Sequence, residues 1–328
     1  MNLPKFSYHR PMTLDQALEL LTQLGDTARL IAGGTDLLVH MKRRLSPPGH
    51  LISLSGLKTM DQISVASGEL VIGAGILLSN LIKSAVIAEQ YPVIRETASL
   101  VATQQIRNMG TLGGNIFQNT RCLYYNCSRV FQKIIAPCLK RDGEVCHATS
   151  GSKRCFAVYQ GDLAPVLIGL RGRAVLHSVT GVEEIPLEEI FTGDGKKPFR
   201  LSHHAILTGI RIPISKDKIF ARYKKYRQRD GMDFPSPGVS VTFVRNGKGL
   251  LGLRICLTGV SSGPVLVKKV EDLDVDRLSA RSIEELAKTA YHEAHPVANL
   301  EDDPDHRKSM VRILVEEILS EAGQTWKE

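Results

Sequence analysis

The stretch "ARLIAGGTD", residues Ala28–Asp36, decides how we interpret this 328-residue chain. Its short apolar run predicts a buried β-strand, and the two glycines after it predict a turn that exposes backbone N–H groups. Such a turn can bind the phosphates of an anionic ligand, although a ligand-free strand-to-helix turn accounts for the same residues equally well. The candidate contacts are Ala32, Gly33, Gly34, Thr35 and Asp36.

A second glycine-rich stretch, "IRNMGTLGGNI" at Ile106–Ile116, repeats this chemistry further along the chain. Its glycine content predicts a loop rather than the interior of a helix or strand. Two separate Gly-Gly loops predict one extended anion held from two sides, and the pyrophosphate of a dinucleotide fits that description. The candidate contacts here are Thr111, Gly113, Gly114 and Asn115.

The pattern around these loops predicts three units, at residues 1–57, 58–215 and 216–328. In the first unit, "MTLDQALELLTQLGD" predicts an amphipathic helix capped by Thr13 and ended by Gly25. The last unit is expected to contain a β-hairpin that turns at Asn246-Gly247.

Two helices are expected to finish the chain. One begins at a capping box, Ser282–Glu285, and the other starts near Pro304. The second helix is expected to present one apolar face, formed by Met310, Ile313, Leu314, Ile318 and Leu319.

Composition narrows the class of protein. The net charge of +8 comes from 42 basic and 34 acidic residues spread along the chain, so no clustered basic face predicts a nucleic-acid partner. No segment approaches the roughly 20 apolar residues that span a bilayer, and the N-terminus lacks the apolar core of a signal peptide. We therefore expect a cytoplasmic protein that binds neither nucleic acid nor membrane.

Five of the six cysteines lie between Cys122 and Cys155. Disulfides seldom persist in the cytosol, and the segment contains neither a zinc knuckle nor a C-x-x-C pair. Thiolates delivered singly from a loop-like segment suit an iron–sulfur cluster. Spacing alone leaves zinc and unpaired thiols open as alternatives.

The ordered strings "LIAGGTDLL", "IRNMGTLGGNI", "GDLAPVLIGL", "ILTGIRIPI", "KKYRQRDGMDFP" and "CLTGVSSGPV" resemble the FAD-binding medium subunits of the molybdenum hydroxylases. The resemblance covers essentially the whole chain. It implies an α+β chain with a PCMH-type FAD-binding fold of two α/β subdomains, followed by a C-terminal α+β domain like that of CO dehydrogenase flavoproteins. It also implies FAD held by both glycine loops, with Asp162 near the flavin nucleotide and Lys225 near the flavin; Lys224 is the alternative register.

Residues 119–160 form an insertion that most members of this family lack. It resembles the extra segment of the β subunits of 4-hydroxybenzoyl-CoA reductases, which carries a 4Fe–4S cluster, in its cysteine intervals and in the strings "TRC", "YN", "CLK" and "CH". The resemblance implies four cluster ligands: Cys122, Cys138, Cys146 and Cys155. Cys127 matches no ligand, and Cys256 lies in the last unit.

The resemblance further implies an electron-transfer subunit with no catalytic acid or base of its own. Its expected partners are a large subunit with the molybdenum cofactor and a small subunit with 2Fe–2S centres, in a dimer of heterotrimers. A ferredoxin-like donor would supply electrons for reductive removal of a phenolic hydroxyl. The alternatives are a hydroxylase subunit with reversed electron flow and, in a different class, a zinc-stapled assembly module.

Overall fold

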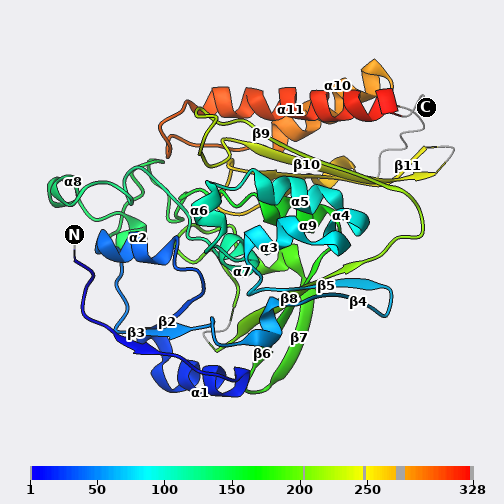
Figure 1. The fold of residues 1–328 in the computed structure, drawn as a ribbon. Coiled ribbons are helices and arrows are strands. Elements are labelled where there is room, and N and C mark those ends of the chain that lie inside the picture. The colour runs from blue at the N-terminus through cyan, green and yellow to red at the C-terminus, as the bar shows by residue number, and fades with distance from the viewer. Residues whose placement is uncertain (1, 202–203, 247–248, 271–277, 326–328) are drawn as a thin grey trace.

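The computed structural model describes residues 2–201, 204–246, 249–270 and 278–325. Its three sheets draw on residues 7–53, 63–213 and 219–266, and we propose the domain limits 1–57, 58–215 and 216–328 for the units that they form. The N-terminal unit lies at one end of the molecule and the helices of the C-terminal unit at the other, with the largest sheet and its helices between them (Figure 1).

The N-terminal unit is a small parallel sheet with the strand order β1-β3-β2. Its elements are β1 (Ser7–His9), α1 (Leu14–Leu24), η1 (Gly25–Thr27), β2 (Ala28–Ile31), α2 (Leu37–Lys42) and β3 (His50–Ser53). The expected first helix is confirmed, because the Thr13 side chain accepts a hydrogen bond from the Gln16 N–H and Gly25 ends the helix at φ 50°.

The middle unit is built on an antiparallel sheet with the strand order β4-β5-β8-β6-β7. Its strands are β4 (Ile63–Ala66), β5 (Glu69–Gly73), β6 (Arg173–Ser178), β7 (Gly181–Pro186) and β8 (Ile206–Pro213). Its α-helices are α3 (Leu78–Lys83), α4 (Ala85–Gln90), α5 (Pro92–Ser99), α6 (Gln104–Arg107), α7 (Leu112–Ile116), α8 (Arg129–Ile134) and α9 (Leu163–Gly169). Short 3-10 turns lie at η2 (Lys58–Asp61), η3 (Leu139–Arg141) and η4 (Leu187–Ile190).

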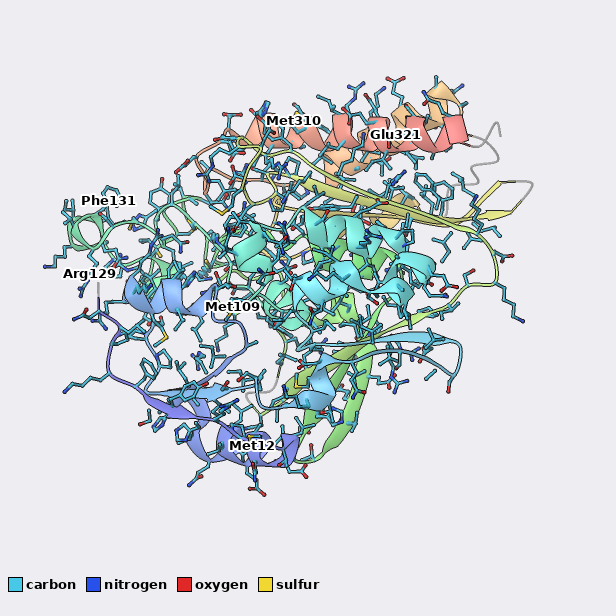
Figure 2. The ribbon with its side chains drawn as sticks, viewed as in Figure 1. Met12, Met109, Arg129, Phe131, Met310 and Glu321 are labelled. Atoms are coloured by element: carbon cyan, nitrogen blue, oxygen red, sulfur yellow. The ribbon has the colours of Figure 1, made fainter. Side chains whose placement is uncertain are left out.

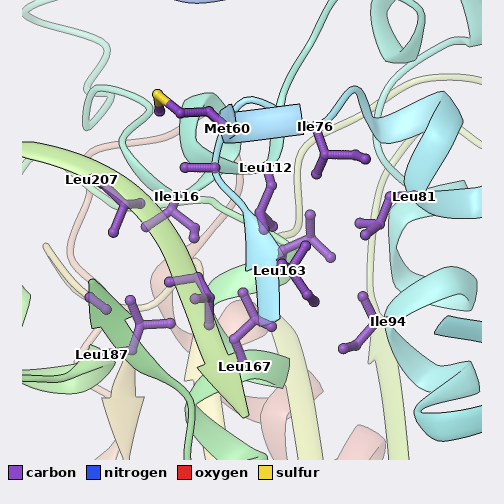
Figure 3. Packing of buried hydrophobic residues seen from close by; sticks show 14 of the residues in the cluster. Met60, Ile76, Leu81, Ile94, Leu112, Ile116, Leu163, Leu167, Leu187 and Leu207 are labelled. Carbon is purple, nitrogen blue, oxygen red and sulfur yellow. The ribbon is translucent and has the colours of Figure 1, made fainter. Parts of the chain in front are cut away.

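Helix α9 lies at the centre of the main core, and all seven of its residues are buried. It packs against α5, α7 and the strands β9, β10 and β11. Figure 3 shows Leu163 and Leu167 of this helix close to Leu112 and Ile116 of α7. Helix α9, which follows the insertion, therefore packs directly against α7, which carries the second glycine loop.

The C-terminal unit is an antiparallel sheet, in the order β12-β11-β10-β9, covered by two helices. Its elements are β9 (Ile219–Lys225), β10 (Gly238–Asn246), β11 (Gly249–Thr258), β12 (Val265–Leu266), η5 (Lys268–Val270), α10 (Ala280–Glu293) and α11 (Pro304–Thr325). Strands β10 and β11 form the expected hairpin, but Gly247 of its turn lies outside the described residues.

Three expectations about helices need correction. The second glycine stretch is not simply a loop, because residues 112–116 form α7 after a cap at Thr111. Helix α10 begins three residues earlier than the expected box, with Ser279 as its cap and Ser282 as the reciprocal partner. Ile313 of α11 is 42% exposed. The buried face of that helix consists of Val311, Leu314, Val315, Ile318, Leu319 and Ala322.

Within the described ranges, no helix has the length and apolar content needed to cross a bilayer.

Candidate functional site

The two glycine loops meet in the structure. A Cβ added to Gly33 would lie 1.9 Å from the carbonyl oxygen of Met109, and one added to Gly110 would lie 3.7 Å from the Thr35 hydroxyl oxygen. Figure 2 shows Met109 near the middle of the molecule, by α2 of the N-terminal unit. The two glycine loops, at residues 32–36 and 111–115, therefore lie next to each other in the structure.

The first loop presents backbone donors. Gly34 has φ +68°, a left-handed conformation that glycine adopts without strain. Within the described part of the chain, no hydrogen bond leaves the N–H groups of Gly33, Gly34 or Thr35. A turn with several unpaired N–H groups can bind an anion such as a phosphate.

The second loop is the start of α7. The Thr111 side chain accepts a hydrogen bond from the Gly114 N–H (3.1 Å), and an added Cβ on Gly113 would lie 3.0 Å from the Ala74 carbonyl oxygen. Asn115 is buried, and its Oδ1 accepts the Leu163 N–H (3.2 Å). Glycine at position 113 thus permits close packing, whereas Thr111 and Asn115 fix the turn.

Asp36 connects the first loop to the insertion. Its carboxylate accepts the Asn119 N–H (2.9 Å) and a hydrogen bond from Arg121 Nη2 (2.7 Å), and His40 Nε2 lies 3.6 Å away. The guanidinium of Arg121 also lies 3.9 Å from the centre of the Phe234 ring. The side chain of Asp36 does not cap α2, so its contacts in this structure are to the segment that carries the cysteines.

Asp162 and Lys225 form a buried ion pair. Lys225 Nζ donates to Asp162 Oδ1 (2.9 Å), and the Tyr223 hydroxyl donates to the same oxygen (3.0 Å). Burial raises the pKa of Asp162, and the Lys225 ammonium opposes that shift. Lys224 instead pairs with Glu317 of α11 (3.0 Å) and with a second acid of that helix, so only Lys225 of the two lysines reaches Asp162.

The four cysteines proposed as ligands line one pocket. Cys122, Cys138, Cys146 and Cys155 all line this small pocket, which is partly open to solvent. Within the described ranges, no three Cys, His, Asp or Glu side chains are arranged to hold a single metal ion. Cys127, whose Sγ donates to the Tyr124 carbonyl oxygen (3.1 Å), is not part of this lining. Cys256 is buried on β11.

Burial shifts the pKa of two thiols of this pocket, those of Cys122 and Cys155. It raises the pKa of Cys122 to about 11, although the backbone N–H groups of Tyr124 and Tyr125 oppose that shift. It also raises the pKa of Cys155, whose sulfur accepts the Ala157 N–H (3.4 Å). Thiols in such surroundings stay protonated at neutral pH unless a metal displaces the proton.

The backbone of the insertion is held at several points. Its two ends pair with each other, since Arg121 N donates to the Val158 carbonyl oxygen (2.8 Å) and Val158 N donates back (2.7 Å). A tight turn brings Cys138 beside Val145, where Leu139 N donates to the Val145 carbonyl oxygen (2.8 Å). Leu123 N donates to a carbonyl oxygen of the C-terminal unit, that of Asn299 (2.9 Å).

Lys140 is the functional side chain that sequence reasoning missed. It lines the cysteine pocket, and its Nζ donates to Asn119 Oδ1 (2.7 Å) and to the Gly195 carbonyl oxygen (2.7 Å). Burial lowers the pKa of Lys140 to about 8, and Cys155 opposes the shift. The sequence around Lys140 did not predict a buried position for it, because a lysine in a loop is ordinarily exposed to solvent.

A known protein family and several characterised proteins resemble this chain. The family model described as FAD binding domain in molybdopterin dehydrogenase matches residues 4–215. The carbon monoxide dehydrogenase medium chain of Hydrogenophaga pseudoflava is 26% identical, over 97% of this chain and 97% of that protein. The aldehyde oxidoreductase FAD-binding subunit of Escherichia coli is 30% identical, over 89% of this chain and 92% of that protein.

The fold agrees with these relatives. A solved carbon monoxide dehydrogenase structure from Hydrogenophaga pseudoflava superposes with a TM-score of 0.81 at 25% identity, and the match covers 99% of each chain. The expected α+β architecture with a PCMH-type FAD-binding fold is confirmed. The chain therefore belongs to the family of FAD-binding domains in molybdopterin dehydrogenases, and it is an FAD-binding medium subunit of the molybdenum hydroxylase type of oxidoreductase.

Proposed function

We propose that this chain transfers electrons between a 4Fe–4S cluster in the cysteine pocket and FAD at the joined glycine loops. The observation that carries the proposal is the convergence of four cysteines, far apart in the sequence, on one pocket that Asp36 and Arg121 connect to the first glycine loop. The proposed ligands of the cluster are Cys122, Cys138, Cys146 and Cys155. The proposed FAD contacts are Ala32, Gly33, Gly34, Thr35, Asp36, Thr111, Gly113, Gly114, Asn115, Asp162 and Lys225.

The residues fit these two groups. Unpaired N–H groups at Gly33, Gly34 and Thr35 suit a pyrophosphate, and the buried Asp162–Lys225 pair keeps a fixed charge pattern close to α7. When bound, the flavin and the cluster accept and release electrons. The protein contributes binding, orientation and electrostatics to that chemistry.

We prefer a cluster to zinc because the cysteine intervals resemble those of a cluster-bearing subunit. A zinc ion needs four sulfurs at about 2.3 Å from one centre, whereas a cluster spreads its four thiolates over separate irons. The four cysteines line one pocket, as four cluster ligands must. N–H groups directed at the sulfurs of Cys122 and Cys155 are a further property that tunes iron–sulfur centres.

We propose that the complete enzyme is of the 4-hydroxybenzoyl-CoA reductase kind, because the cysteine intervals and adjacent strings of the insertion resemble that subunit. Its other parts would be a large molybdenum-cofactor subunit and a small 2Fe–2S subunit, in a cytoplasmic dimer of heterotrimers served by a ferredoxin-like donor. The substrate would bind on the large subunit and lose its phenolic hydroxyl there.

A hydroxylase with reversed electron flow is the second candidate. The names of the relatives favour it, since they include a xanthine dehydrogenase FAD-binding subunit from Escherichia coli as well as the carbon monoxide and aldehyde enzymes. The two candidates differ in the reaction of the purified complex. Reduction of an aromatic acyl-CoA by a low-potential donor supports the first, and substrate-dependent reduction of an external acceptor without that activity supports the second.

Metal and flavin analysis tests the shared part of the proposal. The complex is purified without oxygen, and acid denaturation is expected to release FAD, in roughly equal amount to this subunit, because no residue pattern for covalent flavin attachment is evident. A Cys138→Ser variant should lose iron and sulfide attributable to this chain, while the matched Cys127→Ser variant should keep both. Zinc in place of iron would leave the pocket as a structural staple and remove its redox role.

A further inference from the structure

Lys140 lines the cysteine pocket, and among the described residues its ammonium has no carboxylate at ion-pairing distance. The residue is 8% exposed, and its Nζ donates to Asn119 Oδ1, to the Thr120 backbone and hydroxyl oxygens, and to the Gly195 carbonyl oxygen. All of these acceptors are neutral. Within the described ranges, no carboxylate lies at ion-pairing distance from this ammonium, and Asp36 is already paired with Arg121.

A buried charge that is hydrogen-bonded but not neutralised is costly in a folded protein. The groups that can become negative beside Lys140 are the thiols of the same pocket. Four thiolates around a metal centre form an anion that would balance the ammonium locally. The Asp36 carboxylate also acts on it, but from beyond ion-pairing distance and while paired with Arg121. The position of the ammonium is thus favourable when the pocket holds a metal centre with four thiolates. It is unfavourable when the pocket is empty, because the buried charge is then not balanced.

The position of the ammonium is fixed by surrounding structure. Lys140 belongs to the 3-10 turn η3 directly after Cys138, and its Nζ lies 4.9 Å from the centre of the Tyr125 ring. The Gly195 carbonyl comes from a loop outside the insertion, whose own N–H donates to the Cys155 carbonyl oxygen (2.9 Å). The other basic side chains of the segment differ, since Arg121 is ion-paired and Lys133 is exposed on α8.

We propose that Lys140 is the charge-compensating residue of the cluster pocket and that it raises the reduction potential of the bound centre. This inference rests on the proposed function. Reduction adds one electron, and so one negative charge, to the centre; the electron comes from the donor, and no proton is required. A nearby fixed cation in a poorly solvated site stabilises the more negative state, so reduction becomes easier.

The test is a redox titration of the assembled complex, followed by electron paramagnetic resonance with dithionite as the electron source. Lys140→Gln should keep the iron content of the wild type and lower the equilibrium constant for reduction by about tenfold, which is about 59 mV for a one-electron couple. Lys140→Arg should stay close to the wild type. Lys133→Met removes the same formal charge from the surface of the same segment and should change the potential little.

An unchanged potential in a fully loaded Lys140→Gln complex overturns the inference. If that variant binds no iron, thermal unfolding of metal-free protein decides, with Lys140→Met as the second variant. Charge compensation predicts that metal-free Lys140→Met unfolds at the same or a higher temperature than metal-free wild type, because an unbalanced buried charge has been removed. A lower unfolding temperature means that Lys140 serves only to hold the segment. Absence of iron from the wild-type complex itself would count against the proposed function, independently of any Lys140 variant.

Discussion

Gly33 and Gly34 are both needed in the first loop, but for different physical reasons. At Gly33 the backbone of Met109 occupies the space that a side chain would need, since an added Cβ would lie 1.9 Å from its carbonyl oxygen. At Gly34 the reason is conformational, because φ is +68°. The sequence predicts glycine chemistry at both positions, but it does not show that the residues across from Gly33 belong to the second loop.

Gly34→Val should deplete the complex of FAD. The substitution imposes backbone strain of about 1–3 kcal/mol. It also brings an added Cβ to 3.1 Å from Leu38 and 3.2 Å from Ile31, so the loop that presents the N–H groups must shift. The matched control is Gly68→Val, at φ +75° in open space on the β4–β5 turn. Both variants carry the conformational strain, the first should lose more stability because of its tight neighbours, and only the first should lose its flavin absorbance. Equal flavin content in the two would show that the loop does not bind the cofactor.

Lys225→Met should destabilise the protein by roughly 3–5 kcal/mol, because it leaves the buried Asp162 carboxylate without its cation. The pKa of Asp162, already raised by burial, should rise further. The folded state then holds a proton that the unfolded state releases, so the variant should gain stability as pH falls through the folded pKa. Denaturant unfolding at several pH values measures this trend.

Lys224→Met is the control for that experiment. Its ammonium pairs with half-exposed glutamates of α11, so its loss should cost less than about 1 kcal/mol and add no pH dependence. Similar losses in the two lysine variants would contradict the assignment of Lys225 as the partner of Asp162. The sequence left the choice between these neighbours open, because alternation along β9 separates their faces only once the register of the strand is known.

Helix α11 shows what an apolar pattern can and cannot predict about an element. Its existence and its start at Pro304 follow from the pattern, and Leu314, Ile318 and Leu319 are buried as expected. Ile313 is exposed because the face is fixed by contacts with α10, β9 and β10, which the helix pattern alone does not contain. The same limitation explains α7, where the Thr111 cap and the contact with α9 outweigh the low helix propensity of its two glycines.

Leu314→Ala in α11 should lower the free energy of unfolding by about 2–5 kcal/mol, because it leaves a cavity against the C-terminal sheet. Ile313→Ala, one residue earlier and 42% exposed, should cost less than about 1 kcal/mol. Chemical denaturation of the two variants makes the comparison. The reverse order would mean that the helix is rotated from the position described here.

Arg121→Met should loosen the insertion without unfolding the rest of the chain. The substitution leaves Asp36 without its ion pair and removes the cation that lies against Phe234. Hydrogen exchange should accelerate within residues 119–160 and in the first glycine loop. Arg43→Met, which removes a single bond to the Asn126 carbonyl oxygen, should change exchange much less.

At the scale of the whole molecule, the insertion forms a basic projection. Residues 119–160 contain seven Lys or Arg residues and two Asp or Glu residues. Figure 2 shows Arg129 and Phe131 of α8 at the outer edge of the molecule, and Val130 and Ile134 of the same helix are 71% and 73% exposed. Charge around an exposed apolar patch is suited to a transient acidic partner.

Electron transfer from the ferredoxin-like donor that we propose, taken to be acidic, should therefore slow as ionic strength rises. The double variant Arg129→Glu with Lys133→Glu should lower the association rate by about tenfold or more at low salt and should weaken its salt dependence. The double variant Arg281→Glu with Lys288→Glu, on the exposed surface of α10, is the control with the same change in net charge. Equal rates in the two variants would place the donor elsewhere, and stopped-flow mixing of donor and complex measures them.

Most of the global architecture was predictable, whereas the meeting of distant residues was not. The family strings anticipate the FAD-binding fold along the whole chain, and the cysteine intervals mark the insertion. The strings and intervals do not predict the contact of Lys140 with Gly195 or that of Asp36 with Arg121. Both contacts depend on how the insertion packs against the rest of the chain. Residue spacing helps to predict local turns, but it says very little about contacts between segments that are far apart in the sequence.

The paired ends of the insertion have an evolutionary consequence. Because Arg121 and Val158 exchange two backbone hydrogen bonds, the chain leaves the domain and re-enters it at one point. The coding sequence for the segment between them could therefore be gained or lost without changing the strand order of any sheet. A lineage could in this way add a cysteine-rich segment to an existing flavoprotein in a single step and refine its contacts afterwards.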